Sequence, residues 1–255
     1  MPTHQEHTSL FRSLHIPGNP IILYNIWDAG SAKAVAKSGA KALATGSAPV
    51  ALAQGFSDGE QMPLDLALEN IRRIIAAVGL PVSMDLEGGY GVEADIVGIT
   101  VSRAVAAGIV GFNFEDQVVG GDGLHDINAQ SMRIKSARAA ADSDSVSPFI
   151  NARTDIFLKA KPDTHNDVML NEAIERANAY EQAGADGFFA PGLADEKMIA
   201  TLCEKINLPV NIIALPHVPP NDRLSELGVA RISYGPVPYR QMIRALSDAA
   251  AKTFA

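Results

Sequence analysis

Cysteine is nearly absent from this sequence, since Cys203 is the only one in 255 residues. A single thiol excludes an intramolecular disulfide and a metal site built from several thiolates. Its place inside an expected helix favours a small buried side chain over a nucleophile. Basic charge is also scarce, with 21 lysines and arginines against 29 acidic residues and a formal charge of −8. The nearest basic cluster, Arg133, Lys135 and Arg138, fits a solvated helix face, so we expect no nucleic-acid partner.

Long apolar runs and the common catalytic motifs are missing as well. No stretch reaches 18 consecutive apolar residues and residues 1–12 are polar, so we expect a cytoplasmic protein with no signal peptide and no membrane partner. The six histidines, at positions 4, 7, 15, 125, 165 and 217, lack the spacing of a zinc site. The sequence has no P-loop and no G-x-S-x-G motif, and no lysine ends an expected strand, which disfavours Schiff-base chemistry.

A repeated strand–helix unit is the main feature that the sequence does contain. Four times a helical stretch ends in glycine, at positions 39, 108, 184 and 228, and an apolar run follows closely. Glycine after a helix provides a left-handed cap, and a strand close behind it indicates a tight loop. Two further runs follow Leu-Pro pairs. The expected strands are 21–25, 42–45, 82–85, 111–114, 149–152, 187–190, 210–213 and 230–234.

The expected strands are mostly apolar, which is typical of parallel strands covered on both faces. Eight strand–helix units in about 250 residues match the size of a TIM barrel. A doubly wound sheet would favour a glycine-rich turn after the first strand, and residues 25–30 lack G-x-G-x-x-G. We therefore predict an α/β protein, a single-domain (β/α)8 TIM barrel that spans residues 1–255.

Acidic side chains gather where two neighbouring strands of this barrel end. Asp85 and Glu87 lie two apart on a segment that we expect to be extended, and Glu115 ends the next strand. Catalytic groups of such barrels lie at the carboxyl ends of strands, and three converging carboxylates need a counter-charge. A hard divalent cation held by oxygen ligands, Mg²⁺ or Mn²⁺, would supply it. The alternative is that Asp85 and Glu87 are solvated loop acids or helix caps.

Groups that could hold an anion lie at two other strand ends. Arg153 ends the fifth strand, where its guanidinium could bind a carboxylate or phosphate bidentately. Alternatively, it forms a purely structural pair with Asp155. The backbone N–H groups after Gly46, together with the Ser47 hydroxyl, could receive an anionic head group. Asp116 fits a structural acid better than a ligand.

These segments, together with several others, occur in an order along the chain that indicates a resemblance to a known family. The sequence resembles the phosphoenolpyruvate mutase/isocitrate lyase superfamily over nearly its whole length, from about residue 10 to residue 244. The joint order and spacing of the motifs are highly specific. They are NIWDAGSAKA at 25–34, SDGEQ at 57–61, DLEGGYG at 85–91, EDQ at 115–117, ARTD at 152–155, RANAYEQAGAD at 176–186 and ELGVARISYG at 226–235.

The resemblance implies a Mg²⁺ site, with Mn²⁺ as the alternative ion. Asp85 matches the residue that binds the metal directly. Glu87 replaces the commoner Asp, and its longer side chain would act through water. Glu115 and Asp58 match acids that hold metal-bound water, and Asp58 is also expected among the catalytic residues.

The resemblance further implies a small 2-oxo acid or enol-pyruvate substrate. The N–H groups of Ser47 and Ala48 would hold the substrate carboxylate. Arg153 matches the substrate-binding arginine and counts among the expected catalytic residues. Asn211, inside the seventh strand, completes the expected substrate-binding set.

The loop after the fourth strand departs from the family pattern. Family lyases carry Lys and Cys there and mutases carry Lys and Asn, whereas residues 115–126 read EDQVVGGDGLHD. Pro191 stands where mutases have a histidine. Without the cysteine a retro-aldol cleavage lacks its acid, and without Lys and Asn phosphoryl migration is weakened. Decarboxylation needs fewer catalytic side chains, because the cation stabilises the enolate and water can deliver the proton.

We therefore expect a Mg²⁺-dependent carbon–carbon lyase or decarboxylase that acts on an oxaloacetate-like 2-oxo acid. His125 titrates near neutrality and is the candidate in this loop for protonating the enolate, although it could instead only anchor the loop. One alternative is a phosphoenolpyruvate or phosphonopyruvate mutase or hydrolase. The other is a protein that binds 2-oxo acids without turning them over.

The C-terminal segment 237–253 predicts an amphipathic helix with Met242, Ile243, Leu246 and Ala250 along one face. Because members of the superfamily commonly exchange their eighth helix between subunits, we expect a homodimer or homotetramer in which this helix is exchanged. The alternative is that the helix packs on its own barrel.

Overall fold

The computed structural model describes residues 2–142 and 146–254, where eight parallel strands form one sheet in the order β1-β8-β7-β6-β5-β4-β3-β2. They are β1 (Ile21–Leu23), β2 (Leu43–Ala44), β3 (Val82–Asp85), β4 (Gly111–Glu115), β5 (Phe149–Arg153), β6 (Gly187–Phe189), β7 (Val210–Ile213) and β8 (Arg231–Ser233). A parallel bridge between Ile26 and Thr45 joins the chain after β1 to the chain after β2, which brings the two ends of the sheet together. The predicted TIM barrel is confirmed, and each expected strand agrees with an observed one within two residues.

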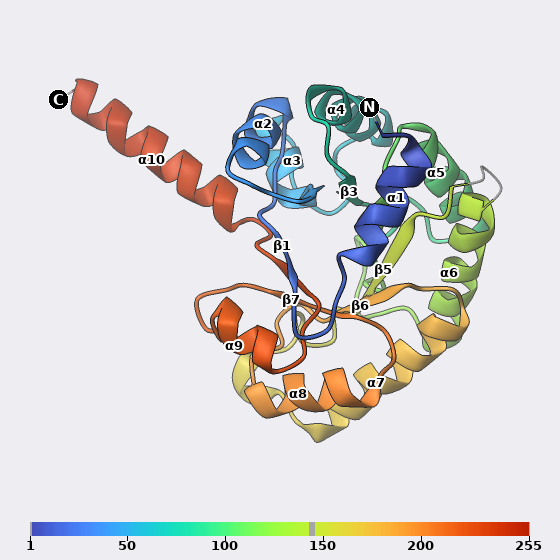
Figure 1. The fold of residues 1–255 in the computed structure, drawn as a ribbon. Helices are drawn as coiled ribbons and strands as arrows, with labels where there is room; N and C mark the ends of the chain where they lie inside the picture. The colour runs from blue at the N-terminus through green and yellow to red at the C-terminus, as the bar shows by residue number, and fades with distance from the viewer. Residues whose placement is uncertain (1, 143–145, 255) are drawn as a thin grey trace.

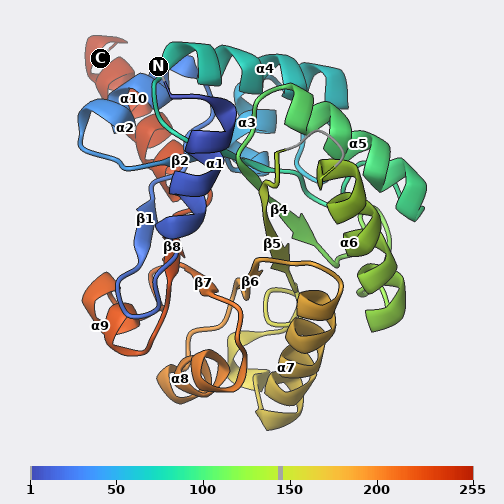
Figure 2. The same ribbon diagram turned by 45° about the vertical axis from the view of Figure 1, so that its right-hand side comes forward.

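Most helices surround the strands on the outside of the barrel (Figures 1 and 2). They are α1 (His4–Ser13), α2 (Ala29–Lys37), α3 (Ser47–Ala53), α4 (Leu64–Ala77), α5 (Ala94–Ala106), α6 (Ile127–Asp142), α7 (Asp167–Gln182), α8 (Glu196–Lys205), α9 (Asn221–Glu226) and α10 (Val237–Phe254), with a short 3₁₀ helix at Pro162–Thr164. Their apolar faces and the strands form one large buried core. The glycines at 39, 108, 184 and 228 all have φ between 91° and 105°, as their role as helix caps requires.

The amino-terminal end of the barrel is closed by α1 and the residues after it. The Phe11 ring meets Phe149 of β5 edge-on at 5.9 Å, and the His15 ring stacks on Phe149 at 4.0 Å. A Cβ atom at Gly111 would lie 2.8 Å from the Phe149 carbonyl oxygen, so only glycine fits there. With this end plugged, the carboxyl ends of the strands are the face at which a site can open.

The interpretation of Arg133 and Arg138 as a solvated helix face was wrong. Arg133 is only 3% exposed, donates to the carbonyls of Gly88 and Gly91, and lies over the Phe114 ring at 4.9 Å. Arg138 forms an ion pair with Asp186. This face of α6 is buried because it packs on turns whose backbone carbonyl groups need hydrogen-bond donors. Arg133 thereby fixes the turn after β3, which carries candidate site residues.

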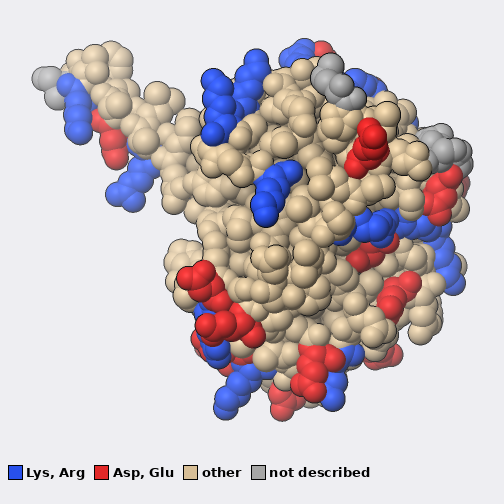
Figure 3. All heavy atoms as spheres, in the orientation of Figure 1, with Lys and Arg blue, Asp and Glu red and all other residues tan. Residues whose placement is uncertain are grey.

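Helix α10 is the exception to the barrel pattern. It projects away from the rest of the chain in Figures 1 and 3, and Pro238 is its only buried residue. Met242, Ile243, Leu246 and Phe254 on this helix are at least 36% exposed. Within residues 2–142 and 146–254, every helix is too short or too polar to traverse a lipid bilayer.

Candidate functional site

Asp85 occupies the end of β3, where the loops after β2 and β3 meet. Its N–H donates to the Thr45 hydroxyl at 3.0 Å, and its Oδ2 atom accepts the N–H of Ser47 at 3.1 Å. Its Oδ1 atom is buried and has no hydrogen-bond partner within the described ranges. A buried carboxylate oxygen without a partner is costly, and a hard cation is a fitting partner for it.

Glu87 does not continue the extended conformation that we expected. Its φ is 52°, in the left-handed region, although its carbonyl still accepts the N–H of Glu115 at 3.0 Å. The reason is a reciprocal brace between two loops. The Glu87 carboxylate accepts the N–H groups of Gly59 and Glu60 at 3.0 and 2.7 Å, while the Glu60 carboxylate accepts the N–H of Tyr90 at 2.8 Å. Burial, and next the charge of Asp85, raise the pKa of Glu87 to about 7.

Asp58 completes the acidic group on the side of the loop after β2. Burial raises the pKa of its carboxyl, and the charge of Asp85 raises it further. A hydrogen bond with the Ser47 side chain opposes that rise. Ser47 therefore touches both acids, through its backbone N–H to Asp85 and through its side chain to Asp58.

Arg153 lies between two carboxylates at the ends of β4 and β5. Its Nη1 atom is 2.8 Å from Oε2 of Glu115, and its Nε and Nη2 atoms donate to the two Asp155 oxygens at 2.6 and 2.8 Å. The alternative pairing with Asp155 is therefore present, together with a second pairing to Glu115. A guanidinium has five N–H groups, and contacts within residues 2–142 and 146–254 use three of those of Arg153, which leaves two to donate to a ligand.

The carboxylate next in the chain, Asp116, has a structural role. It is 0% exposed and accepts the N–H of Asp155 at 3.0 Å, the Tyr180 hydroxyl at 2.8 Å and Arg176 at 3.1 Å. All these donors belong to the barrel and to α7. Asp116 thus fixes the segment that carries Asp155 and leaves Asp155 free to hold Arg153.

The glycine-containing loop 116–126 folds back on itself and lies over the turn after β3. Gln117 and Leu124 form an antiparallel bridge, and Val119 lies against Gly88 so closely that a Cβ atom there would be 2.7 Å from its Cγ2. The backbone of His125 anchors the far end of the loop, because its N–H donates to the Asp116 carbonyl at 2.7 Å. Burial is the main cause that lowers the pKa of the His125 ring.

The predicted acids do not form a site in which all of them bind one cation directly. Within residues 2–142 and 146–254, no three His, Cys, Asp or Glu side chains are grouped to hold one ion. Glu87 and Glu115 already accept from protein donors, which leaves the unpartnered oxygen of Asp85 as the candidate for direct contact with a cation. The donor set consists of oxygen atoms, so the residues fit Mg²⁺ or Mn²⁺ with the remaining acids acting through water.

The predicted substrate-binding residues do not all meet at the mouth. Ser47 and Ala48 begin α3 beside Asp85, but Asn211 is 0% exposed inside the barrel, where its Oδ1 atom accepts the Ser233 hydroxyl at 3.2 Å. Sequence reasoning missed Lys159, which donates at 3.2 Å to Gln117, itself a donor to Glu115 at 3.2 Å. Nothing in the pattern around position 159 predicts this contact, because it depends on how two loops meet.

Comparison with known families agrees with this geometry. The family model described as phosphoenolpyruvate phosphomutase matches residues 11–254. The chain belongs to this family. The match covers every strand of the barrel and all the acids described above, so the resemblance inferred from the motifs is confirmed.

Relatives in the phosphoenolpyruvate phosphomutase family differ in the reaction that their names state. The 2-methylisocitrate lyase of Escherichia coli is 30% identical, over 91% of this chain and 83% of its own length. The oxaloacetate decarboxylase of Pseudomonas entomophila is 26% identical, over 96% and 84%. The crystal structure of a candidate phosphonomutase from Burkholderia cenocepacia is 45% identical with a TM-score of 0.96, over 98% of this chain and 100% of that one. The family therefore contains lyases, decarboxylases and mutases.

Proposed function

We propose that the chain is a Mg²⁺- or Mn²⁺-dependent lyase that releases CO₂ from a small 3-carboxy-2-oxo acid such as oxaloacetate. The bond between C3 and the departing carboxylate breaks, its electron pair forms the enolate of the 2-oxo acid, and a proton then adds to C3. The divalent cation, when bound, would act as a Lewis acid that stabilises this enolate. The observation that carries the proposal is the buried, unpartnered oxygen of Asp85 at the end of β3, at the same end of the barrel as Arg153, an arginine with unused donors.

The chain's own residues would bind and orient the substrate. The two N–H groups of Arg153 that the ion pairs leave free can donate to a substrate carboxylate, while Glu115 and Asp155 keep the guanidinium fixed. The N–H groups at the start of α3, Ser47 and Ala48, lie on the other side of Asp85. The carboxylate that leaves as CO₂ needs no acid catalyst, in agreement with a loop that has few acidic groups.

We assign protonation of the enolate to groups on the two loops beside the site. Loop 116–126 lies over the turn after β3 and would exclude bulk water when a ligand is bound. His125 remains the proposed proton donor from that loop, with Asp58 as the acid on the opposite loop. Burial raises the pKa of Asp58, which favours its protonated form.

Phosphonomutase or phosphonate hydrolase chemistry is the second candidate. It is favoured by the 45% identity to the candidate phosphonomutase from Burkholderia cenocepacia. Against it stands the loop sequence, because Gly121 and Gly123 offer no side chain to a transferring phosphoryl group. Binding of 2-oxo acids without turnover is the remaining alternative.

A panel of substrates separates these candidates. Oxaloacetate, phosphonopyruvate, 2-methylisocitrate and isocitrate are incubated with the protein and Mg²⁺ or with EDTA, and pyruvate, phosphate, phosphoenolpyruvate, succinate and glyoxylate are measured. The proposal expects Mg²⁺-dependent pyruvate from oxaloacetate and only background from the two tricarboxylates. Phosphoenolpyruvate or phosphate from phosphonopyruvate as the main product would favour the second candidate. Efficient methylisocitrate cleavage would overturn the argument from the loop.

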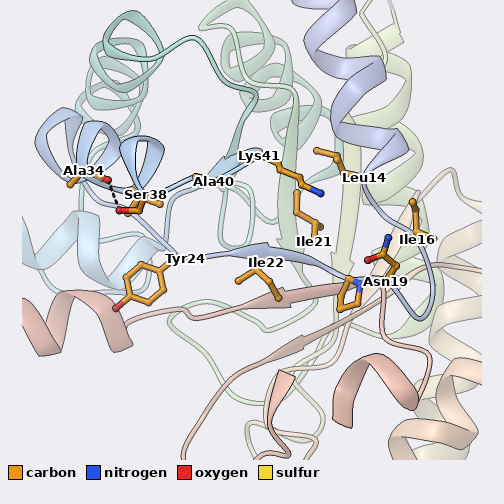
Figure 4. A pocket seen from close by; sticks show the side chains of 13 residues that line it. Leu14, Ile16, Asn19, Ile21, Ile22, Tyr24, Ala34, Ser38, Ala40 and Lys41 are labelled. Carbon is orange, nitrogen blue, oxygen red and sulfur yellow. Dashed lines mark hydrogen bonds between the residues drawn. The ribbon is translucent and has the colours of Figure 1, made fainter. Parts of the chain in front are cut away.

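We also propose that the protein is a homodimer, or a tetramer of dimers, in which α10 packs on the partner's barrel. A groove of about 730 Å³ lies outside β1, and Figure 4 shows Ile22 of β1, Tyr24 just after that strand, and Ser38 at the end of α2 among its lining residues. Ile22 and Tyr24 are 39% and 38% exposed, although strands of a barrel are normally covered by helices. Charged side chains are sparse over the middle of this face (Figure 3). The exposed apolar face of α10 from a second copy is the occupant that we propose for this region.

A further inference from the structure

Arg231 crosses the interior of the barrel from one wall to the other. It begins β8, is 1% exposed, and its Nη2 atom donates at 3.0 Å to Oδ1 of Asn113 on β4. In the strand order β8 and β4 lie opposite each other. Its Nε atom donates to the Ser233 hydroxyl at 3.3 Å. A guanidinium therefore occupies a level of the barrel where branched apolar side chains are usual.

The surroundings of Arg231 are polar but carry no compensating carboxylate in contact with it. Asn151 donates to the same Asn113 oxygen at 2.9 Å, and Ser233 donates to Asn211 at 3.2 Å. Arg231 takes part in no ion pair within residues 2–142 and 146–254, and its Nη1 atom has no hydrogen-bond partner there. A buried charge without a contact partner opposes folding strongly, so its presence calls for a reason.

Asp85 is the negative charge that acts on Arg231. Asp85 pairs in register with Asn113 across β3 and β4, and Asn113 is the residue that accepts from Arg231. Side chains at one register position share a face of the sheet, so Asp85 lies on the same face of the sheet as the Asn113 side chain that Arg231 contacts. Desolvation lowers the pKa of Arg231 to about 9, and Asp85 opposes that change, so the side chain is a cation at neutral pH.

We infer that Arg231 is a positioning residue that supplies a fixed internal positive charge to the site around Asp85. This inference rests on the proposed function, because it concerns the same cation and anion. The charge weakens the attraction of the acids for a bare divalent cation. It strengthens the attraction for a small dianion such as oxalate, which mimics the enolate of the 2-oxo acid. Arg231 acts through the field across the barrel and touches neither ligand.

The test is a pair of binding measurements that need no turnover. Mn²⁺ affinity is measured by electron paramagnetic resonance without ligand, and oxalate affinity by calorimetry at saturating Mn²⁺. Arg231→Met removes the charge and keeps the volume, and it should bind Mn²⁺ about tenfold more tightly and oxalate about tenfold more weakly than the wild type. Arg231→Lys keeps the charge and should stay within about threefold of the wild type for both ligands.

The opposite signs separate a field effect from a packing effect. If Arg231 only filled space, Arg231→Met would change both affinities in the same direction, or Arg231→Lys would be as altered as Arg231→Met, and either result overturns the inference. Replacement of a buried charge by an apolar group is often neutral or stabilising, so Arg231→Met should fold. If Arg231→Met does not fold, Arg231→Gln also removes the charge and gives the same comparison. Absence of Mn²⁺ binding in the wild type would also overturn the inference. Opposite shifts without any pyruvate from oxaloacetate would refute the proposed function and leave the role of Arg231 standing.

Discussion

The Nη1 atom of Arg153 lies 2.8 Å from Oε2 of Glu115, at the register position where β4 and β5 pair. Burial raises the pKa of Glu115, and the Arg153 guanidinium opposes that rise. The Arg153 side chain is 14% exposed and that of Glu115 is 6% exposed, so this pair is shielded from solvent. Two neighbouring strands thus fix an arginine at the mouth before any ligand arrives.

Removal of this guanidinium should damage both stability and binding. Arg153→Met leaves Glu115 and Asp155 buried without their cation, and unfolding in urea should require about 3–5 kcal/mol less than in the wild type. Arg153→Lys keeps the charge, so it should be nearly as stable as the wild type. Because an ammonium group cannot form the paired hydrogen bonds of a planar guanidinium, this variant should bind oxalate at least about tenfold more weakly. Oxalate binding by Arg153→Lys at wild-type affinity would contradict the binding role.

Closure of loop 116–126 depends on the missing side chain of Gly88. Gly88→Ala places a methyl group 2.7 Å from Cγ2 of Val119 and should push the loop off the site. We expect kcat for oxaloacetate decarboxylation to fall about tenfold with little change in the melting temperature. The double variant Gly88→Ala/Val119→Ala removes the clash and is the matched control. Recovery of activity in the double variant supports the closure, and an equal loss in both variants would refute it.

Exchange of α10 should be visible as the size of the particle in solution. Leu246 is 62% exposed on the isolated chain, and Leu246→Asp would place a charge in the proposed interface. Light scattering at micromolar concentration should give a dimer or tetramer for the wild type and a monomer for this variant. Asp248→Ala, on the opposite side of the helix, should keep the wild-type size. A wild type that is only monomeric would refute the exchange.

His15 should make stability depend on pH. Burial is the main cause that lowers its pKa to about 3 in the folded chain, from about 6.5 when unfolded, and the charge of Arg231 contributes. Between these values the unfolded chain binds one proton more, so stability is present above pH 6.5 and is lost as the pH falls. From pH 6.5 to pH 5 the wild type should lose about 2 kcal/mol more than His15→Gln in chemical denaturation. Equal losses in the two proteins would contradict this assignment.

The positions of the strands could be predicted because the signals for them are local. Glycine caps at 39, 108, 184 and 228 adopt the left-handed conformation that a helix end requires, and the strand follows within a few residues. The same local signal failed at Glu87, since its left-handed backbone depends on amide groups in a loop 27 residues earlier. Arg133 failed for a related reason, because charge pattern along a helix does not reveal which carbonyls the helix will meet.

The site could be predicted only in part. Asp85, Glu115 and Arg153 lie at strand ends, where the barrel fold itself predicts chemistry, and the structure brings Glu115 and Arg153 into contact. Arg231 could have attracted notice as a lone charge within the apolar run 229–234. Its reach to Asn113 on the opposite wall, however, follows from closure of the barrel, which no local pattern encodes.

Release of pyruvate from oxaloacetate tests the central claim most directly. The wild type, Asp85→Ala and the surface control Asp163→Ala are each assayed with Mg²⁺ and with EDTA, against a protein-free sample with Mg²⁺ that corrects for spontaneous decarboxylation. We predict Mg²⁺-dependent pyruvate release by the wild type and Asp163→Ala, and a rate for Asp85→Ala that equals the protein-free rate while its melting temperature is unchanged. Wild-type release at the protein-free rate, or undiminished Mg²⁺-dependent release by Asp85→Ala, would contradict the account.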